Sequence, residues 1–442
     1  MKKVVVFGAG LVAGAHVRYL LEHGYQVTVA SRTVAKAKEI VGDHPNGSPV
    51  AFDIEREGDE RLGEIVREHD LAVSLLPYVY HTRVARSCLR HRKHMATTSY
   101  VKPEMQALDA DAKKLDLVLL NESGVDPGID HMTAMKVIHR VKKAGGEITR
   151  FTSYCGGLPA PEANDNPFGY KFSWSPRGVL MAGRNAARYR QDGDVVEIPG
   201  PELFLHYTCV PVEVEGRVIP FEGYPNRDSL PYADTYGITT TRTMFRGTLR
   251  NQGWCATLKK VADLGLLEEA ESKLDGLTYA QLTGKLIGKA GRASKAEVAA
   301  HLGLAPINPI VTNLDWLGLF SAKRLPAGCR SPLDVLTATM LAKMSFAAGE
   351  RDLLVLQHQF LAEYADHKER ITSTMIDFGI PHGDSSMNRT VGLPAAVGVR
   401  LILEGKIKSR GVLVPVLPEI YEPALVELER LGIRFTETSE RI

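Results

Sequence analysis

The first 125 residues alternate short runs typical of buried strands with stretches that place apolar residues at helical spacing. The short runs are Lys3–Phe7, Gln26–Ala30, Ser48–Asp53, Leu71–Leu76, Lys93–Thr98 and Leu117–Asn121. The helical stretches between them are Val12–His23, Val34–Val41, Glu60–Glu68, Arg83–Arg92 and Pro103–Lys114. Strands and helices that alternate at these lengths predict an α/β fold, built as a doubly wound parallel sheet with right-handed crossovers.

The pattern changes after residue 125. It predicts a helix over His131–Lys143, a strand over Ile148–Tyr154, a long polar loop over Gly156–Trp174, and mixed strands and turns over 178–255. The stretch 256–378 is predicted to be mainly helical, with Leu333–Ala348 and Arg351–Ala365 as its long helices. The C-terminal part again alternates helices and strands, with helices predicted over Ala395–Leu403 and Tyr421–Leu431 and a strand over Gly411–Pro415. Such a tail is expected to rejoin the first domain.

A glycine-rich turn follows the first predicted strand. Gly8 and Gly10 hold the first two positions of a G-x-G-x-x-G/A pattern, and Ala13 holds the third. The first glycine permits the tight turn, the second lets the backbone approach a pyrophosphate, and the small third residue, with Gly14 beside it, allows close packing of the helix. An ordinary glycine turn also fits this pattern. Its place between a strand and an amphipathic helix favours a dinucleotide, with phosphates at the helix N-terminus.

The residue that ends the second strand selects between NAD and NADP. An acid there binds the ribose 2′-hydroxyl of NAD, whereas a nearby arginine accommodates the 2′-phosphate of NADP. Here the strand ends in Ser31-Arg32-Thr33, without an acid. Because the guanidinium fork suits a phosphate, we predict NADP as the cofactor. Asp53, which ends the third strand, is either an adenine-side contact or a helix cap.

Composition limits the partners. Hydrophobic residues make up 44% of the chain, charged residues 24%, and the formal net charge is +2, which does not suggest a nucleic-acid partner. No apolar run reaches the ~18 residues of a membrane-spanning helix, and the N-terminus has no signal-peptide pattern, so we expect no membrane partner. The five scattered cysteines form no C-x-x-C pair, which predicts free thiols in a reducing cytoplasm, without disulfides or a metal site.

Several longer strings carry a family resemblance. They are Asp126–His131, which follows the last strand of the predicted sheet, then Tyr154–Pro161, Asn166–Ser175, Tyr224–Ser229, Arg246–Arg250, Gly349–Asp352 and Leu356–His358. In this order they resemble the saccharopine dehydrogenases of the glutamate-forming type, also called saccharopine reductases. The resemblance runs essentially from end to end.

The resemblance implies a fold and a reaction. It implies a Rossmann domain at 1–125, a substrate-binding α+β domain at 126–255, a mainly helical domain at 256–390 that returns to the α+β domain, and a C-terminal segment at 391–442 that rejoins the Rossmann domain. It also implies a homodimer. The implied reaction interconverts L-saccharopine, NADP⁺ and water with L-glutamate, L-2-aminoadipate 6-semialdehyde and NADPH. The family works in lysine synthesis in some lineages and in lysine breakdown in others.

Fused, bifunctional members of the family carry a lysine–ketoglutarate reductase domain upstream of this one. Here the glycine turn begins at residue 8. For a degradative pathway, we therefore expect the first step to come from another polypeptide.

The resemblance also implies which residues form the site. The implied substrate contacts are Ser99, Tyr100, Asp126, Arg227, Thr248, Leu249 and Arg250, with Asp126 and Tyr100 as the candidates for catalysis. The implied cofactor contacts are Gly8, Ala9, Gly10, Leu11, Val12, Ser31, Arg32, Thr33, Asp53, Ile54, Thr98, Ser99, Val125, Asp126, Pro127 and Ser175. Two arginines suit this substrate, because saccharopine is a secondary amine with three carboxylates and each carboxylate can pair with a guanidinium fork.

Three further residues are weaker candidates, and each has an ordinary structural reading. Cys155 is read as a packing residue, and a functional role for His131 is the less favoured reading. Lys171 is either a proton carrier or half of an ion pair, while Glu350 and His358 are read as structural residues on a helical face. Two other functions stay open at this point. One is NADPH-dependent reduction of a different imine, as in carboxyspermidine-type dehydrogenases, and the other is a non-catalytic NADP-binding sensor.

Overall fold

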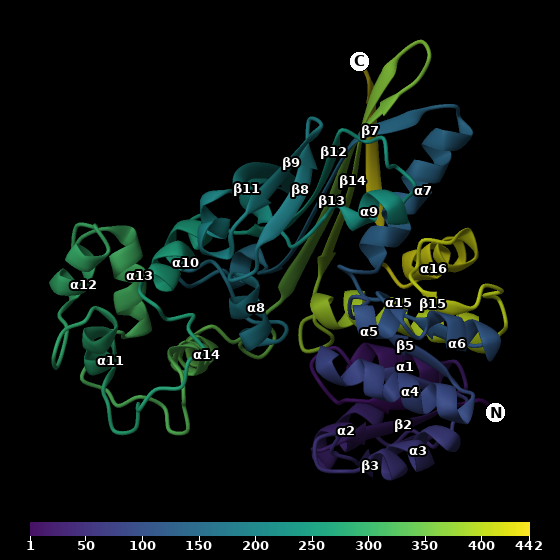
Figure 1. The fold of residues 1–442 in the computed structure, drawn as a ribbon, viewed down its shortest axis with the longest axis horizontal. Coiled ribbons are helices and arrows are strands. Elements are labelled where there is room, and N and C mark those ends of the chain that lie inside the picture. The colour runs from purple at the N-terminus through teal and green to yellow at the C-terminus, as the bar shows by residue number, and fades with distance from the viewer. The chain divides into compact units, whose positions relative to one another are not determined.

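A computed structural model describes all 442 residues. The chain divides into two compact units (Figure 1). The first comprises Met1–Ile148 and Ala362–Ile442, and the second comprises Thr149–Leu361. Elements from both ends of the chain, purple and yellow in Figure 1, therefore belong to the same unit. The four-segment division expected from the sequence remains a prediction.

A seven-stranded sheet lies at the centre of the first unit. Its order is β15-β6-β5-β4-β1-β2-β3, and every neighbouring pair is parallel. The strands are β1 (Lys3–Phe7), β2 (Gln26–Ser31), β3 (Gly47–Ala51), β4 (Leu71–Ser74), β5 (His94–Thr97), β6 (Val118–Leu120) and β15 (Gly411–Leu413). Residues 4–7 of β1 are fully buried, as expected for a strand covered on both faces. The predicted doubly wound sheet is confirmed, and the C-terminal segment contributes its seventh strand.

Helices complete the first unit. They are α1 (Gly14–Glu22), α2 (Val34–Val41), α3 (Asp59–Arg67), α4 (His81–His91), α5 (Pro103–Gln106), α6 (Asp109–Lys114), α7 (Ile129–Lys143), α15 (Ser386–Leu403) and α16 (Pro418–Arg430). The predicted helix over 103–114 is thus two short helices. Two glycines let α1 and α15 approach closely: a Cβ on Gly14 would lie 3.1 Å from Nδ2 of Asn388, and one on Gly392 would lie 2.9 Å from the Val12 carbonyl oxygen.

The second unit combines a sheet with helices, as the α+β prediction required. Its strands run in the order β10-β11-β12-β7-β13, with β8 and β9 beside them. They are β7 (Glu147–Pro159), β8 (Ala187–Gln191), β9 (Asp194–Ile198), β10 (Thr208–Val214), β11 (Arg217–Pro225), β12 (Thr243–Arg250) and β13 (Asp352–Glu363), and the unit boundaries fall within β7 and β13. The helices are α8 (Pro176–Ala182), α9 (Pro231–Thr235), α10 (Trp254–Asp263), α11 (Tyr279–Leu286), α12 (Lys295–His301), α13 (Pro309–Leu317) and α14 (Pro332–Lys343).

Several predicted elements are wrong. The helix expected over Arg351–Ala365 is the strand β13, so His358 lies on a strand and not on a helical face. The first seven residues of β13 are all buried, which removes the alternation that would reveal a strand. The helical stretch expected to reach residue 378 ends earlier, because Lys368–Phe378 forms β14, which pairs antiparallel with an unpredicted β16 (Phe435–Arg441) in the first unit.

Two further boundaries differ from the prediction. The predicted loop over Gly156–Trp174 begins later, because β7 continues to Pro159. Helix α15 begins at Ser386, upstream of Pro394, although a proline normally marks a helix boundary. No helix in the structure combines the length and the apolar character needed to span a bilayer.

Candidate active site

The carboxyl edge of the parallel sheet gathers most of the predicted cofactor residues. Gly8 follows β1, Ser31 ends β2, Asp53 follows β3, Thr98 follows β5 and Val125 follows β6. The carboxyl ends of neighbouring parallel strands meet at one edge, as the pairs Phe7↔Ala30 and Phe7↔Ser74 show for β4, β1 and β2. This edge is where doubly wound sheets bind ligands.

The glycine turn has the geometry that a pyrophosphate needs. Gly8 has a φ of +112°, and a Cβ there would lie 2.9 Å from the Leu75 carbonyl oxygen, so only glycine fits. A Cβ on Gly10 would meet no atom within 4 Å, so the backbone there is open to a ligand. The N–H groups of Leu11 and Val12 donate to no protein acceptor. Because they precede α1, they fit the phosphates of a dinucleotide.

The ends of β2 and β3 are consistent with the cofactor prediction. The Thr33 backbone N–H donates to Ser31 Oγ at 3.2 Å, which shapes the turn, and the neighbouring Arg32 side chain is exposed and so accessible to a phosphate. Asp53 is not a helix cap, because α3 begins only at Asp59 and has Gly58 at its N-cap; instead, Asp53 Oδ1 accepts the Glu55 N–H at 3.0 Å. That bond stabilises the local turn and leaves the adenine-side contact a prediction.

Tyr100 and Asp126, which are 26 residues apart, meet in the first unit. The Tyr100 hydroxyl donates to Asp126 Oδ1 at 3.0 Å. This pairing could not be read from the sequence, because it depends on how the turns after β5 and β6 approach each other. The Asp126–Pro127 peptide bond is cis.

A histidine that sequence reasoning missed contacts Ser99. His81 is buried, with Nε2 lying 2.8 Å from Ser99 Oγ and Nδ1 lying 2.8 Å from Ser74 Oγ. Burial lowers the pKa of His81 to about 4, so the ring is neutral near pH 7 and exchanges hydrogen bonds with the two hydroxyls. The sequence offers no signal for it, since His81 simply begins α4.

In the second unit, β12 carries the predicted substrate residues Thr248, Leu249 and Arg250. Thr248 pairs with Tyr224 on β11 and with Cys155 on β7. Because alternate strand residues share a face, Thr248 and Arg250 project to the same side of the sheet, and Leu249 projects to the other.

Arg250 is a buried cation without an ion pair. It is 4% exposed, and its Nη1 donates to the Leu249 carbonyl oxygen at 2.7 Å. The guanidinium lies over the rings of Tyr170 and Trp254, with centroid distances of 4.9 Å and 5.5 Å, while Nε is buried without a partner. Glu222 is its partner across the strands, but that carboxylate accepts the backbone N–H groups of Gly253 and Cys255. Buried charges normally have a counter-ion, so Arg250 fits an anionic ligand.

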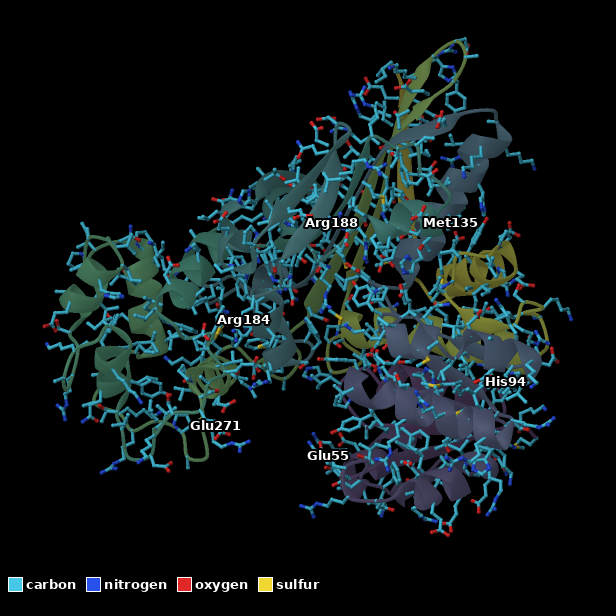
Figure 2. The ribbon with its side chains drawn as sticks, viewed as in Figure 1. Glu55, His94, Met135, Arg184, Arg188 and Glu271 are labelled. Atoms are coloured by element: carbon cyan, nitrogen blue, oxygen red, sulfur yellow. The ribbon has the colours of Figure 1, made fainter.

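The other predicted residues of this unit lie elsewhere within it. Arg227 is exposed in the turn after β11, and its carbonyl oxygen accepts the backbone N–H of Arg188, labelled in Figure 2, at 2.9 Å. Ser175 caps α8, where its Oγ accepts the Gly178 N–H at 3.2 Å. Lys171 is held at 2.8 Å from Glu350; burial alone would lower its pKa, but this ion pair raises it. The structural reading of Lys171 is therefore favoured.

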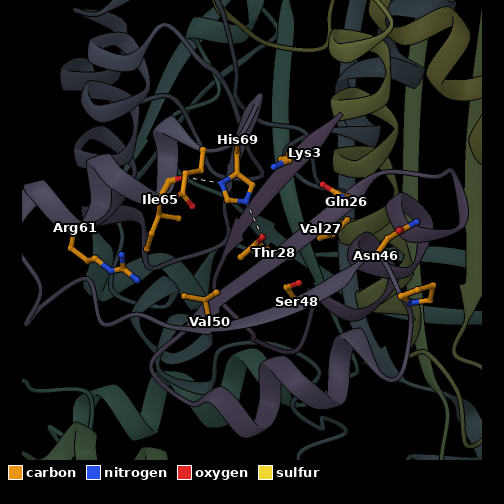
Figure 3. Close-up of a pocket in the computed structure, with 12 residues that line it drawn as sticks. Lys3, Gln26, Val27, Thr28, Asn46, Ser48, Val50, Arg61, Ile65 and His69 are labelled. Carbon is orange, nitrogen blue, oxygen red and sulfur yellow. Dashed lines mark hydrogen bonds between the residues drawn. The ribbon is translucent and has the colours of Figure 1, made fainter. Parts of the chain in front are cut away.

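The first unit also contains a cavity of about 280 Å³ (Figure 3). Its lining includes Lys3, Gln26 and Ser48, at or near the amino ends of β1, β2 and β3. It therefore opens at the edge of the sheet opposite the glycine turn, and no predicted site residue lines it. Nor does the structure hold any group of three or more His, Cys, Asp or Glu residues that would suit a metal ion.

Comparison with known proteins decides the family. Residues 4–120 match the saccharopine dehydrogenase NADP-binding domain, and residues 124–433 match the saccharopine dehydrogenase C-terminal domain. The chain belongs to the saccharopine dehydrogenase family. The resemblance seen in the sequence and the predicted NADP-binding domain are thereby confirmed.

Relatives within the saccharopine dehydrogenase family match over their full length. A saccharopine dehydrogenase [NADP(+), L-glutamate-forming] of Pyricularia oryzae is 42% identical, over 99% of this chain and 98% of its own. The enzyme of the same name from Schizosaccharomyces pombe is 40% identical, over 99% of both chains. The structure of an apo, histidine-tagged saccharopine dehydrogenase (L-Glu forming) from Saccharomyces cerevisiae matches with a TM-score of 0.89 and 37% identity, over the whole of both chains.

Proposed function

We propose that this chain catalyses the NADP-dependent interconversion of L-saccharopine and water with L-glutamate and L-2-aminoadipate 6-semialdehyde, as a step of lysine metabolism. Full-length relatives that bear this activity in their names support the proposal over the carboxyspermidine-type alternative. The observation that carries it within the structure is Arg250, because a buried guanidinium without an ion pair suits a substrate carboxylate. A non-catalytic sensor would have no need of this group or of the Tyr100–Asp126 pair.

The substrate carboxylates are bound by cations and hydroxyls of the second unit in this proposal. Arg250 supplies Nη–H donors, and Thr248, which projects from the same face of β12, adds a hydroxyl. Arg227 binds a second carboxylate from the turn after β11. A substrate with fewer carboxylates and more amines would favour acids at these positions.

The Tyr100–Asp126 pair serves the reacting amine. NADP⁺, when bound, accepts a hydride from the substrate carbon next to nitrogen. The amine must first lose its proton, since its lone pair assists the departure of the hydride. In this proposal Asp126 binds the amine, and the Tyr100 hydroxyl, which lies 3.0 Å from Asp126 Oδ1, relays that proton. Water then adds to the C=N bond of the oxidised substrate, which separates into glutamate and the semialdehyde.

The first unit holds the cofactor in this proposal. The N–H groups of residues 10–12 bind the pyrophosphate, and Ser31, Arg32 and Thr33 bind the 2′-phosphate. Asp53 and Ile54 lie on the adenine side. Residues 98–99 and 125–127 line the nicotinamide half.

We further propose a cytoplasmic homodimer. The dimer rests on the family resemblance, and all five cysteines are free thiols, which supports a reducing compartment. Light scattering on a size-exclusion column is expected to give twice the 48.5 kDa mass of one chain. A single-chain mass at micromolar concentration would contradict the dimer.

Turnover of saccharopine tests the proposed function. We expect purified protein to form NADPH from NADP⁺ only when L-saccharopine is present, at alkaline pH, with one glutamate released per NADPH. NAD⁺ should be a poor substitute. Binding of NADPH without turnover would support the sensor instead, and absence of saccharopine-dependent NADPH formation would rule out the proposed activity.

A further inference from the structure

One buried carboxylate joins the two segments of the first unit that carry Tyr100 and Asp126. Glu122 lies two residues after β6 and is 6% exposed. Its Oε1 accepts the backbone N–H of Val101 at 2.9 Å, and its own N–H donates to the Ser99 carbonyl oxygen at 3.1 Å. These two bonds bracket Tyr100, so Glu122 holds the segment after β5 on both sides of the tyrosine.

The second carboxylate oxygen binds the other segment. Glu122 Oε2 lies 2.7 Å from Nε2 of His131, a fully buried residue in the first turn of α7. Because an ionised carboxylate only accepts hydrogen bonds, the imidazole ring is the donor.

The turn that carries Asp126 is closed on itself between Glu122 and His131. The Gly124 N–H donates to the Pro127 carbonyl oxygen at 2.9 Å, and the Asp130 N–H donates to the Val125 carbonyl oxygen at 3.0 Å. The Asp130 carboxylate in turn accepts the N–H groups of Gly128 at 2.5 Å and of His131 at 2.8 Å. The turn and the start of α7 therefore move as one piece, and the Glu122 carboxylate anchors this piece to Val101.

The backbone of Glu122 indicates that its side chain is there for this purpose. Its φ is +54°, in the left-handed region that few residues other than glycine adopt. Glutamate is also rarely buried unless its charge is paired. A position that would suit glycine thus holds a buried acid, and the acid's two oxygens each have a hydrogen-bond donor.

We propose that Glu122 is a positioning residue that sets the contact between the Tyr100 hydroxyl and the Asp126 carboxylate. The inference rests on the proposed function for the roles of those two residues. When the carboxylate is lost, of the Glu122 bonds to the segment after β5 only the backbone bond from the Glu122 N–H to the Ser99 carbonyl oxygen remains, and the chain at Val101 can shift relative to the turn after β6. The Tyr100–Asp126 hydrogen bond then forms in only a fraction of the molecules.

Glu122→Gln tests the inference with little change of shape. A carboxamide has one acceptor oxygen and a donor NH2 group, so it can accept from the Val101 N–H and still bond His131 only if the imidazole ring changes tautomer. Glu427→Gln is the matched control, because Glu427 is another buried carboxylate of the first unit, 8% exposed and bonded to the Tyr19 hydroxyl at 3.0 Å. Melting temperatures of both variants show whether they are folded.

Amide hydrogen exchange measures the positioning directly and needs no substrate. In Glu122→Gln, we expect the Val101 amide to exchange about ten-fold faster or more, while the Glu427→Gln variant exchanges as the wild type does. Unchanged exchange at residues 99–101 in Glu122→Gln would overturn the proposal. If Glu122→Gln does not fold, Glu122→Asp is measured in the same way, because its shorter side chain keeps the charge but cannot reach both donors.

A double-mutant cycle measures the consequence for catalysis. Glu122→Gln is expected to lower kcat/KM for saccharopine about ten-fold or more, mainly through kcat, and to do much less in a Tyr100→Phe background. Equal losses in the two backgrounds would overturn the proposal. Failure of the wild type to oxidise saccharopine would overturn the proposed function only, since the exchange measurement would still decide the role of Glu122.

Discussion

Arg250 gives the strongest prediction about substrate binding. Arg250→Ala removes a guanidinium that has five N–H donors, one of which the structure commits to the Leu249 carbonyl oxygen. The Nε–H is buried without a partner, so it and the Nη–H groups not bonded to Leu249 remain for a ligand. Arg250→Lys keeps the charge but not the planar fork.

The magnitude follows from those donors. A bidentate carboxylate takes two charge-assisted hydrogen bonds, and losing them from a buried site costs about 2–4 kcal/mol in transition-state stabilisation. This corresponds to a fall in kcat/KM of about 30-fold to 700-fold, at 1.4 kcal/mol for each factor of ten. The kcat/KM of Arg250→Lys should lie between those of the wild type and Arg250→Ala, since a point charge recovers only part of the interaction.

The assay is the initial rate of NADPH formation at several saccharopine concentrations, with NADP⁺ saturating. Arg330→Ala is the control, because it removes an arginine of the same unit whose side chain is 77% exposed, and it should leave the rate unchanged. Arg250→Ala should keep the KM for NADP⁺ close to the wild-type value. A loss of only a few-fold in a variant that melts like the wild type would refute the assignment of Arg250 to a substrate carboxylate.

Other predictions concern the first unit. Arg32→Ala should raise the KM for NADP⁺ far more than that for NAD⁺, and equal changes would contradict the 2′-phosphate role. Gly8→Ala should lower the melting temperature, whereas Gly10→Ala, with open space at its Cβ, should leave it unchanged and weaken NADPH binding in a fluorescence titration. Burial lowers the pKa of both His16 and His81 to about 4. The unfolded chain then binds protons more readily than the folded one, so stability should be lost as the pH falls from 6.5 towards 4. The loss is about 3 kcal/mol for each histidine at pH 4, and urea unfolding followed by circular dichroism would measure it. A constant unfolding free energy over this range would contradict the burial of these rings.

The family was readable from the sequence because its strings are long and contiguous. The residues within Asp126–His131 are consecutive, as are those within Arg246–Arg250. Each pattern can therefore be recognised without knowledge of the fold. The glycine turn and the absence of an acid after the second strand are also local features. The parallel sheet could be predicted for a similar reason, since its buried strands are separated by well-spaced amphipathic helices.

Strand β13 shows where local pattern fails. Its leucines, Val355 and Phe360 fit a buried helix as well as a buried strand, because burial of nearly every residue removes the period of two. Strand β14 does alternate, with Ile371, Ser373 and Met375 buried between less buried neighbours, so a closer reading of that stretch could have found it.

The sequence by itself determined the family and the cofactor class, and it predicted residues for each half of the site. Only the tertiary structure decided which side chains meet. Tyr100 reaches Asp126, His81 reaches Ser99, and the Glu122 carboxylate spans from Val101 to α7. Such contacts join turns that follow different strands, and their distances depend on how the sheet brings its carboxyl edge together. The local sequence pattern does not specify those distances.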